Sequence, residues 1–395
     1  MSDWKIYTIS EACKRFSSGK GITASQIFEI GAYPVFGGNG IRGYTDAYNF
    51  EGECAIIGRQ GAYCGNTKYF CGKAYMTEHA IVATANDEHN IGYIANLLSI
   101  MNLGQYQGQS AQPGLSVNTL SKIELKLPDK KTQDSIFSLL SALDKKIALN
   151  KQINARLEEM AKTLYDYWFV QFDFPDANGK PYKSSGGEMV FDETLKREIP
   201  KGWEVKSLGE IASTSSGGTP TSTVQEYYKD GNIPWVNSGE LNNNFIVHTD
   251  NFITQTGMDN SSAKLVSEKS ILLAMYGATA GKTSLISFKT TTNQAICSIL
   301  PKDMNYRVYI KSYLDNMYLY LVQLSSGSAR DNLSQDKIKR LHLVIPESGI
   351  LEIFSKVTED FYKKIETNLK QNHHLTQLRD FLLPMLMNGQ VSVAE

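Results

Sequence analysis

The chain of 395 residues is an internal repeat, and this duplication constrains its fold more than any other feature. Trp4 in the first copy recurs as Trp203 in the second, and the correspondence continues toward the end of the chain. Further matching pairs are Glu11 and Glu210, Ser18 and Ser216, Pro34 and Pro234, Gly61 and Gly277, Gly65 and Gly281, Ile81 and Ile296, Pro128 and Pro346, and Leu164 and Leu382. Each copy is long enough to be a domain, so the repeat predicts two related domains in tandem.

The offset between the copies locates their main difference. It is 199 residues at the tryptophans, 216 at Gly61 and Gly277, and 218 at Pro128 and Pro346. Most of the additional length of the second copy therefore falls between Pro234 and Gly277. The two modules share a scaffold and differ in one loop region. This region either binds a different target in each module or is a loop without a role whose sequence has drifted, and the sequence leaves both interpretations open.

Each copy begins with a β-rich part. Short apolar runs such as Cys54–Ile57 and Ser270–Met275 lie between glycine clusters, a pattern that favours buried strands. A strand with alternating apolar residues closes each part, just before Pro128 and Pro346.

Each copy then continues into a helical part. In the first copy, positions separated by alternating steps of four and three residues are mostly apolar from Ile136 to Trp168, which is the heptad seam of a long helix. The corresponding seam from Phe354 to Leu386 is less regular, and we expect Pro384 to end or kink it.

These patterns together predict an α+β protein. Two β-rich mixed domains in tandem repeat are separated by two long helices that form an antiparallel coiled coil. The expected segments are a first β-rich domain at 1–128, a helical spacer at 129–171, an exposed linker at 172–199, a second β-rich domain at 200–346 and a C-terminal helical region at 347–395.

Four asparagines occupy seam positions near the middle of the two helices: Asn150, Asn154, Asn368 and Asn372. In an antiparallel pair all four would meet and fix the helix register at some cost in stability. Solvent-facing positions are the alternative interpretation.

Composition excludes several classes of protein. The 40 basic and 41 acidic residues give a formal net charge of −1, which argues against a polybasic tail protein but leaves room for a local nucleic-acid-binding face. No apolar run approaches the ~20 residues of a membrane helix, and the first residues do not resemble a secretion signal. The five cysteines show no metal-ligand spacing, so we expect buried thiols.

No catalytic constellation is found. The segment Gly277–Thr283 resembles a phosphate-binding loop. That motif needs a glycine five positions before Gly281, and Tyr276 occupies this position. The first copy also lacks the lysine that corresponds to Lys282. A repeated scaffold turn explains both copies. The residues alone therefore assign no catalytic role.

The chain resembles the specificity (S) subunits of type I restriction–modification systems over almost its whole length. The resemblance rests on the order of several motifs and on their duplication. These motifs are Tyr33–Gly40, Ile57–Ala62, Ile199–Ile211, Ile233–Leu241, Gly277–Thr283 and Leu375–Gly389. The first copy departs from the pattern by lacking the Ile-Pro-x-Gly lead found before Trp203.

The resemblance implies two target-recognition domains that each read one half of a bipartite, asymmetric DNA site, with the helices setting the spacing and docking methyltransferase (modification) subunits. It implies restriction/translocase subunits as further partners of a cytoplasmic complex. It implies that the chain is not itself an enzyme and holds no cofactor, since S-adenosylmethionine, ATP and Mg would belong to the partner subunits. Base readers are predicted among polar loop residues: Asn39, Arg42, Arg59, Gln60, Lys68, Thr219, Asn237, Asn243, Lys282 and Arg330.

Two other classes stay open from the residues alone. A repeat-built scaffold could bind proteins or glycans, and a nucleotide-dependent enzyme would rest on the imperfect phosphate loop. Selection from random DNA would separate the first from a DNA reader, and nucleotide binding lost on Lys282→Ala would support the second.

Overall fold

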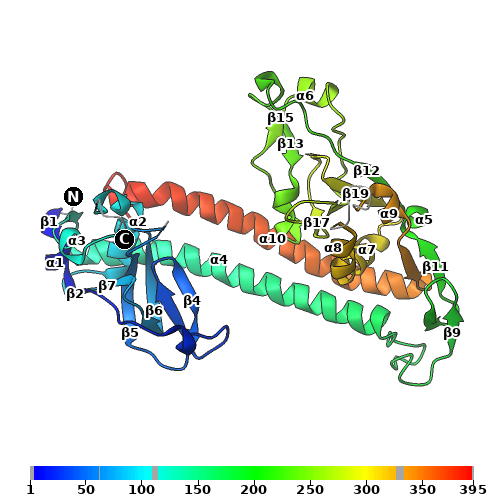
Figure 1. Ribbon diagram of the computed structural model, residues 1–395, viewed down its shortest axis with the longest axis horizontal. Coiled ribbons are helices and arrows are strands. Elements are labelled where there is room, and N and C mark those ends of the chain that lie inside the picture. The colour runs from blue at the N-terminus through cyan, green and yellow to red at the C-terminus, as the bar shows by residue number, and fades with distance from the viewer. Residues whose placement is uncertain (1–3, 62, 109–113, 326–332, 394–395) are drawn as a thin grey trace. The chain divides into compact units, whose positions relative to one another are not determined.

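The computed structural model describes residues 4–61, 63–108, 114–325 and 333–393. The chain forms two compact units (Figure 1). The first comprises Met1–Ala148 and His374–Glu395, and the second comprises Leu149–His373. Arg330, a predicted base reader, lies outside the described residues.

The first unit is built on a six-stranded sheet with the strand order β2-β7-β5-β6-β3-β4. A separate antiparallel pair, β1 with β8, closes the β-rich part. The elements in chain order are β1 (Lys5–Thr8), α1 (Ile9–Ala12), β2 (Cys13–Ser18), η1 (Ala24–Gln26), β3 (Tyr33–Gly37), β4 (Gly40–Thr45), β5 (Phe50–Gly58), β6 (Thr67–Met76), β7 (Ala80–Ala85), α2 (Ile91–Ile100), η2 (Leu103–Tyr106), α3 (Val117–Leu120), β8 (Glu124–Leu127) and α4 (Lys130–Tyr165).

The second unit has a five-stranded sheet, β12-β19-β16-β17-β14, a three-stranded sheet, β15-β13-β18, and the closing pair β11 with β20. Its elements are η3 (Asp166–Val170), β9 (Met189–Asp192), β10 (Arg197–Pro200), β11 (Glu204–Ser207), α5 (Leu208–Ile211), β12 (Ala212–Ser216), η4 (Gln225–Tyr227), β13 (Ile233–Val236), η5 (Ser238–Asn242), β14 (Phe245–Ile246), β15 (Phe252–Ile253), α6 (Gln255–Asp259), β16 (Ile271–Ala274), β17 (Thr283–Ile286), β18 (Thr291–Thr292), β19 (Ile296–Pro301), α7 (Tyr306–Asn316), α8 (Tyr318–Ser325), α9 (Gln335–Lys339), β20 (His342–Ile345) and α10 (Ser348–Met387).

The central strands are continuously apolar because both of their faces are covered. In β5, Ala55 and Ile57 pack in the cluster that contains α2, while Cys54 and Ile56 pack in a second cluster on the other face. The central strand of the second unit, β16, divides its side chains between two clusters in the same alternating way. Side chains that alternate across a strand bury both faces only if every residue is apolar, which explains the uninterrupted runs in the sequence.

Strand pairing confirms the duplication residue by residue. Ala55 pairs with Ala83 in the first unit, and Ile271 pairs with Ile299 in the second, so both partners shift by 216. The sequence match of Ile81 with Ile296 is wrong by one residue. Since the equivalent residues Ser18 and Ser216 pair with Ile81 and Cys297, the true counterpart of Ile81 is Cys297.

Between β13 and β16 the second copy has η5, β14, β15 and α6, and β15 pairs antiparallel with β13 as β4 pairs with β3 in the first copy. The additional elements of the second copy are therefore η5, β14 and α6. The first copy has only the hairpin strand β4 in the corresponding interval between β3 and β5. The predicted location of the length difference is therefore confirmed.

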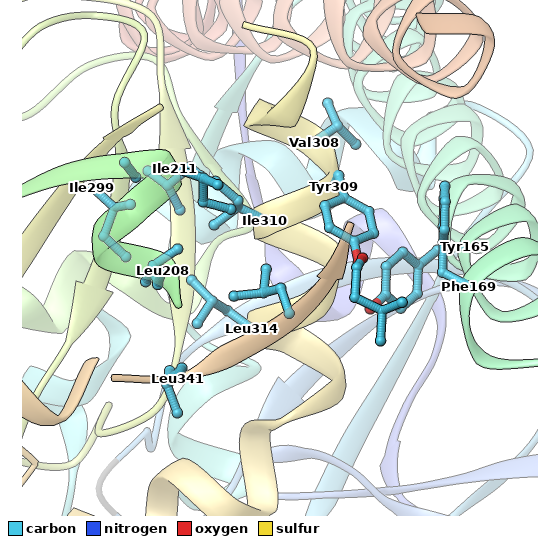
Figure 2. Packing of buried hydrophobic residues seen from close by; sticks show 14 of the residues in the cluster. Tyr165, Phe169, Leu208, Ile211, Ile299, Val308, Tyr309, Ile310, Leu314 and Leu341 are labelled. Carbon is cyan, nitrogen blue, oxygen red and sulfur yellow. The ribbon is translucent and has the colours of Figure 1, made fainter. Parts of the chain in front are cut away.

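The core of the second unit joins the helix α4 to the β-rich part. Tyr165 and Phe169 pack against Tyr309 of α7, and Leu208 and Leu314 extend the same cluster (Figure 2). The buried Tyr309 hydroxyl donates to the Val344 carbonyl, so this ring adds a hydrogen bond to its apolar contacts. The β-rich part of the second unit is thus fixed on the helix by aromatic packing.

The helices α4 and α10 are antiparallel, which is the arrangement in which the four seam asparagines were expected to meet. Within the second unit Asn150 donates to Asn372 at 2.8 Å, and Asn368 donates to Asn154 at 2.8 Å. All four side chains are buried, so the solvent-facing alternative is wrong. In the first unit the pairing continues where Arg379 contacts Asp144 at 2.9 Å.

One expectation about local structure is wrong. The segment 172–199 is not an exposed linker, because Phe172 and Phe174 are buried against Trp203 and β9 pairs with β10. Of the two outcomes expected at Pro384, an end or a kink, the end is excluded, since α10 continues to Met387.

Candidate functional site

The same glycine loop joins two neighbouring strands in both domains. In the first domain Gly58 N–H donates to Asn66 O at 3.0 Å, and in the second Ala274 N–H donates to Lys282 O at 3.0 Å. The glycines at the end of the loop, Gly65 and Gly281, have φ of +89° and +78°, a conformation that favours glycine. The loop that resembles a phosphate-binding motif is therefore the turn of a repeated hairpin.

Other loops meet this hairpin turn at one end of the first domain's sheet. Arg59 N–H donates to His79 O at 2.9 Å, and Thr77 N–H donates to Phe36 O at 3.0 Å. Lys20 N–H donates to Met76 O at 2.9 Å. Four segments distant in the sequence thus form one polar, glycine-rich surface at this end.

The second domain repeats this assembly. Gly218 N–H donates to Thr292 O at 2.8 Å, and Asn293 N–H donates to Val236 O at 3.1 Å. Thr279 Oγ1 donates to Ser238 O at 2.8 Å and thereby ties the glycine loop to η5. Each domain therefore presents an equivalent set of loops on an equivalent frame.

The structure brings some of the predicted readers of the first domain together. Asn39, in the β3–β4 turn, and Lys68, at the start of β6, line one recess of about 170 Å³. Arg42 is exposed on β4. Arg59 is held within the domain, since its Nε donates to Leu115 O at 3.2 Å, and Gln60 forms a β-bridge to Gly114.

The predicted readers of the second domain lie on three of its loops. Thr219 is exposed and its hydroxyl contacts Gln294. Asn237 begins η5, where its N–H donates to Glu240 Oε1 at 2.8 Å. Asn243 is exposed after η5, and the Lys282 ammonium donates to Asn242 Oδ1 at 2.6 Å. No observation tests base contact by any of these residues, so their role stays a prediction.

Sequence reasoning missed two residues of the recess, Tyr63 and Asn66. Tyr63 lies in the glycine loop and is 52% exposed. Asn66 is the counterpart of Lys282 at the offset of 216. This correspondence could have found Asn66, because Lys282 was singled out and its equivalent was not.

The charge around the recess differs from that of the cavities in the second unit. Its lining contains Lys68 and lacks acidic residues among the described part of the chain. The cavities in the second unit are lined by carboxylates, including Glu159 and Asp166. Because a nucleic-acid backbone is anionic, the recess suits it electrostatically, as does the cavity at the start of α4, where Lys130 and Lys131 outnumber Asp134.

The titratable groups of the described residues offer no catalytic or metal site. Burial raises the pKa of the thiols of Cys13, Cys54 and Cys297 to about 12, so these cysteines stay protonated at neutral pH. Cys71 is exposed, in contrast to the expectation of buried thiols. Within the described ranges no three His, Cys, Asp or Glu side chains gather to hold a metal ion, and no helix is both long and apolar enough to cross a membrane.

Comparison with known proteins matches both halves of the chain to one family. The family model for the type I restriction modification DNA specificity domain matches residues 1–159 and 200–376. The specificity subunit of the type I restriction enzyme HindI from Haemophilus influenzae is 30% identical in an alignment of length 331 that covers 71% of this chain and 71% of that protein. The MjaIX specificity subunit of Methanocaldococcus jannaschii is 29% identical over 310 residues, which are 77% of this chain and 69% of that protein.

A solved structure supports the same fold. The S subunit of a type I restriction–modification system from M. genitalium superposes with a TM-score of 0.69 at 16% identity, covering 98% of this chain and 96% of that one. The duplicated strand frame, the antiparallel helices and both matched segments agree, and the chain therefore belongs to the specificity subunits of type I restriction–modification systems.

Proposed function

We propose that each recognition domain, 1–128 and 200–346, reads one half of a bipartite, asymmetric DNA target. The observation that carries this is one hydrogen-bonded loop frame presenting different side chains. Asn66 and Lys68 in the first domain correspond to Lys282 and Ser284 in the second. Major-groove edges differ in their donors and acceptors, so unlike side chains on one frame select unlike half-sites.

The readers proposed for the first half-site are Asn39, Arg42, Arg59, Gln60 and Lys68. Those proposed for the second are Thr219, Asn237, Asn243, Lys282 and Arg330. Amide and guanidinium or ammonium groups match the purine edges, and each good pair contributes roughly 1–3 kcal/mol of discrimination. A substitution of a true reader relaxes one half-site, whereas loss of a phosphate contact weakens both.

The helix pair is proposed to set the spacing between the half-sites and to dock methyltransferase subunits. Side chains suited to such docking are exposed on α4 and α10, among them Met160, Ile353 and Phe381. The catalytic work belongs to the partners, so S-adenosylmethionine, ATP and Mg are placed in the methyltransferase and restriction/translocase subunits. We place the complex in the cytoplasm, where the DNA of a prokaryotic cell lies.

The charge of the chain bears on its affinity for DNA. With a formal net charge of −1, long-range attraction to phosphates is weak. We expect tight binding only in the complex, where partner subunits add phosphate contacts. Tight specific binding by the isolated chain at physiological salt would contradict this expectation.

Selection from random double-stranded DNA with the purified methyltransferase complex tests the proposal. The expected result is enrichment of two short sequence blocks separated by a gap of fixed length. The control is the complex assembled with an unrelated specificity subunit, which should enrich a different pair. Enrichment of one uninterrupted motif, or of none, would contradict the two-reader proposal.

A further inference from the structure

The recess of the first domain has a floor of closely packed backbone. A Cβ atom on Gly58 would lie 2.2 Å from the Gly38 carbonyl oxygen, so only glycine allows the β3–β4 turn to approach β5 this closely. The recess has a volume of about 170 Å³, which leaves room for water or for one polar edge of a ligand.

The rim carries groups that can both donate and accept hydrogen bonds. Asn39 and Asn66 supply amides, Lys68 supplies an ammonium group and Tyr63 supplies a ring and a hydroxyl. All four residues are exposed. Within the described part of the chain, no hydrogen bond or ion pair engages these four side chains. The recess thus presents polar groups whose hydrogen-bonding capacity is directed to solvent.

The second domain uses the equivalent positions differently. At the offset of 216, Tyr63, Asn66 and Lys68 correspond to Thr279, Lys282 and Ser284. All three counterparts contact the segment that follows β13. Thr279 donates to Ser238 O at 2.8 Å, the Lys282 ammonium donates to Asn242 Oδ1 at 2.6 Å, and the Ser284 hydroxyl donates to Asn243 O.

The two domains differ in whether these polar side chains bind a segment of the chain. Where a chain segment covers these positions, the polar side chains bind that segment. In the first domain, none of the described residues, which leave out 62 and 109–113, covers these positions, and amide and ammonium groups surround the recess. Polar groups arranged around a recess in this way are typical of a binding site.

We propose that this recess binds the major-groove edge of a purine in the first half-site, with Asn66 and Lys68 as specificity-determining residues. An asparagine amide pairs with N6 and N7 of adenine, and a lysine donates to O6 and N7 of guanine. The Tyr63 ring gives apolar contact to the neighbouring base. The inference rests on the proposed function, since it names the group that one recognition domain binds.

The test uses the full chain assembled with its methyltransferase subunits. Methylation rates are measured on duplexes that carry every base substitution at each position of both half-sites, for the unaltered complex, Asn66→Ala and Lys68→Ala. Lys73→Ala is the matched control. It removes the same charge from the same strand, but Lys73 pairs with Glu51 and does not line the recess.

The expected result is a loss of discrimination of about 5- to 150-fold at one or two purine positions of the first half-site for Asn66→Ala and Lys68→Ala. The second half-site, the gap and the control variant keep their discrimination. Because discrimination is a ratio of rates, a fall in overall activity does not obscure it. Measuring Lys68→Arg as well keeps the test valid if removal of the charge hinders assembly.

The outcomes separate the two proposals. Unchanged discrimination in both alanine variants overturns the recess as a reader and leaves the two-domain function standing. Equal relaxation of both half-sites also overturns it, because it marks a phosphate or scaffold role. If the unaltered complex shows no split target at all, the proposed function itself fails.

Discussion

Replacing a single buried asparagine at the helix interface should destabilise the protein, while replacing both members of a pair should restore most of the loss. Asn368 Nδ2 donates to Asn154 Oδ1 at 2.8 Å, and the two residues are 2% and 6% exposed. Asn154→Leu leaves the Asn368 amide buried without its acceptor, which costs about 1–3 kcal/mol. Substituting leucine at both positions removes the unsatisfied group, so the double variant should be nearly neutral or more stable.

Thermal unfolding followed by circular dichroism measures the effect. In domains of about 150–250 residues, 1 kcal/mol shifts Tm by roughly 2–4 °C, so the single variants should lose about 2–12 °C. Gln152→Leu is a matched control, because Gln152 is exposed on the same helix and should change Tm little. If the double variant loses the sum of the two single losses, the pair is not coupled and the assignment of these asparagines to register is wrong.

Three further predictions concern spacing, acid sensitivity and the end of the second helix. Inserting seven residues after Ala148 in α4 and seven after His373 in α10 keeps the heptad phase and lengthens the helix pair by about 10 Å. Methylation mapping should then show a gap between the half-sites that is longer by about three base pairs, with both half-site sequences unchanged. An unchanged gap would exclude the helices as the spacer. Hydrogen bonds from the Ser207 hydroxyl and N–H lower the pKa of Glu210 below 4.5, so their stabilisation is full above that pH and is lost as the pH falls through the lower folded value. Acid unfolding of Glu210→Gln should therefore depend less on pH in this range, and an identical profile would contradict the capping role. Leu386 is 2% exposed in the core of the first unit, so Leu386→Ala should lower the free energy of unfolding in denaturant by about 2–5 kcal/mol. A loss below ~0.5 kcal/mol, which is typical of surface substitutions, would show that the helix end is not packed there.

The duplicated frame and the helix pairing could be predicted from the sequence, because both depend on regular residue spacing along the chain. Strand pairing follows the constant offset of 216, and the seam asparagines meet because heptads bring a and d positions together. Sequence reasoning named only some of the residues that line the recess. It missed Asn66 and Tyr63, because the folding of the glycine loop places them there. A spacing pattern does not encode which loop residues converge at the end of a sheet.

The order of the segment after η3 and the course of the helix past Pro384 have a physical cause in tertiary packing. The runs Asp176–Pro181 and Ser184–Gly187 suggested a linker after η3. Phe172 and Phe174 nevertheless bury their rings against Trp203, and that burial orders the segment. Pro384 costs about 3 kcal/mol in a helix interior, yet the last turn buries Leu386 and Met387, each contributing roughly 1.5–3 kcal/mol. Local propensity predicted that Pro384 ends or kinks the helix, and burial of the last turn favours continuation over an end.

Replacing residues 1–128 with the matching part of another specificity subunit tests the central claim most directly. The hybrid is assembled with its methyltransferase subunits in cells, and modified bases are mapped across the genome. The account predicts that one half-site changes to that of the donor, while the other half-site and the gap stay the same, because each domain reads DNA through its own loops. A hybrid that changes both half-sites, or neither, would contradict the account.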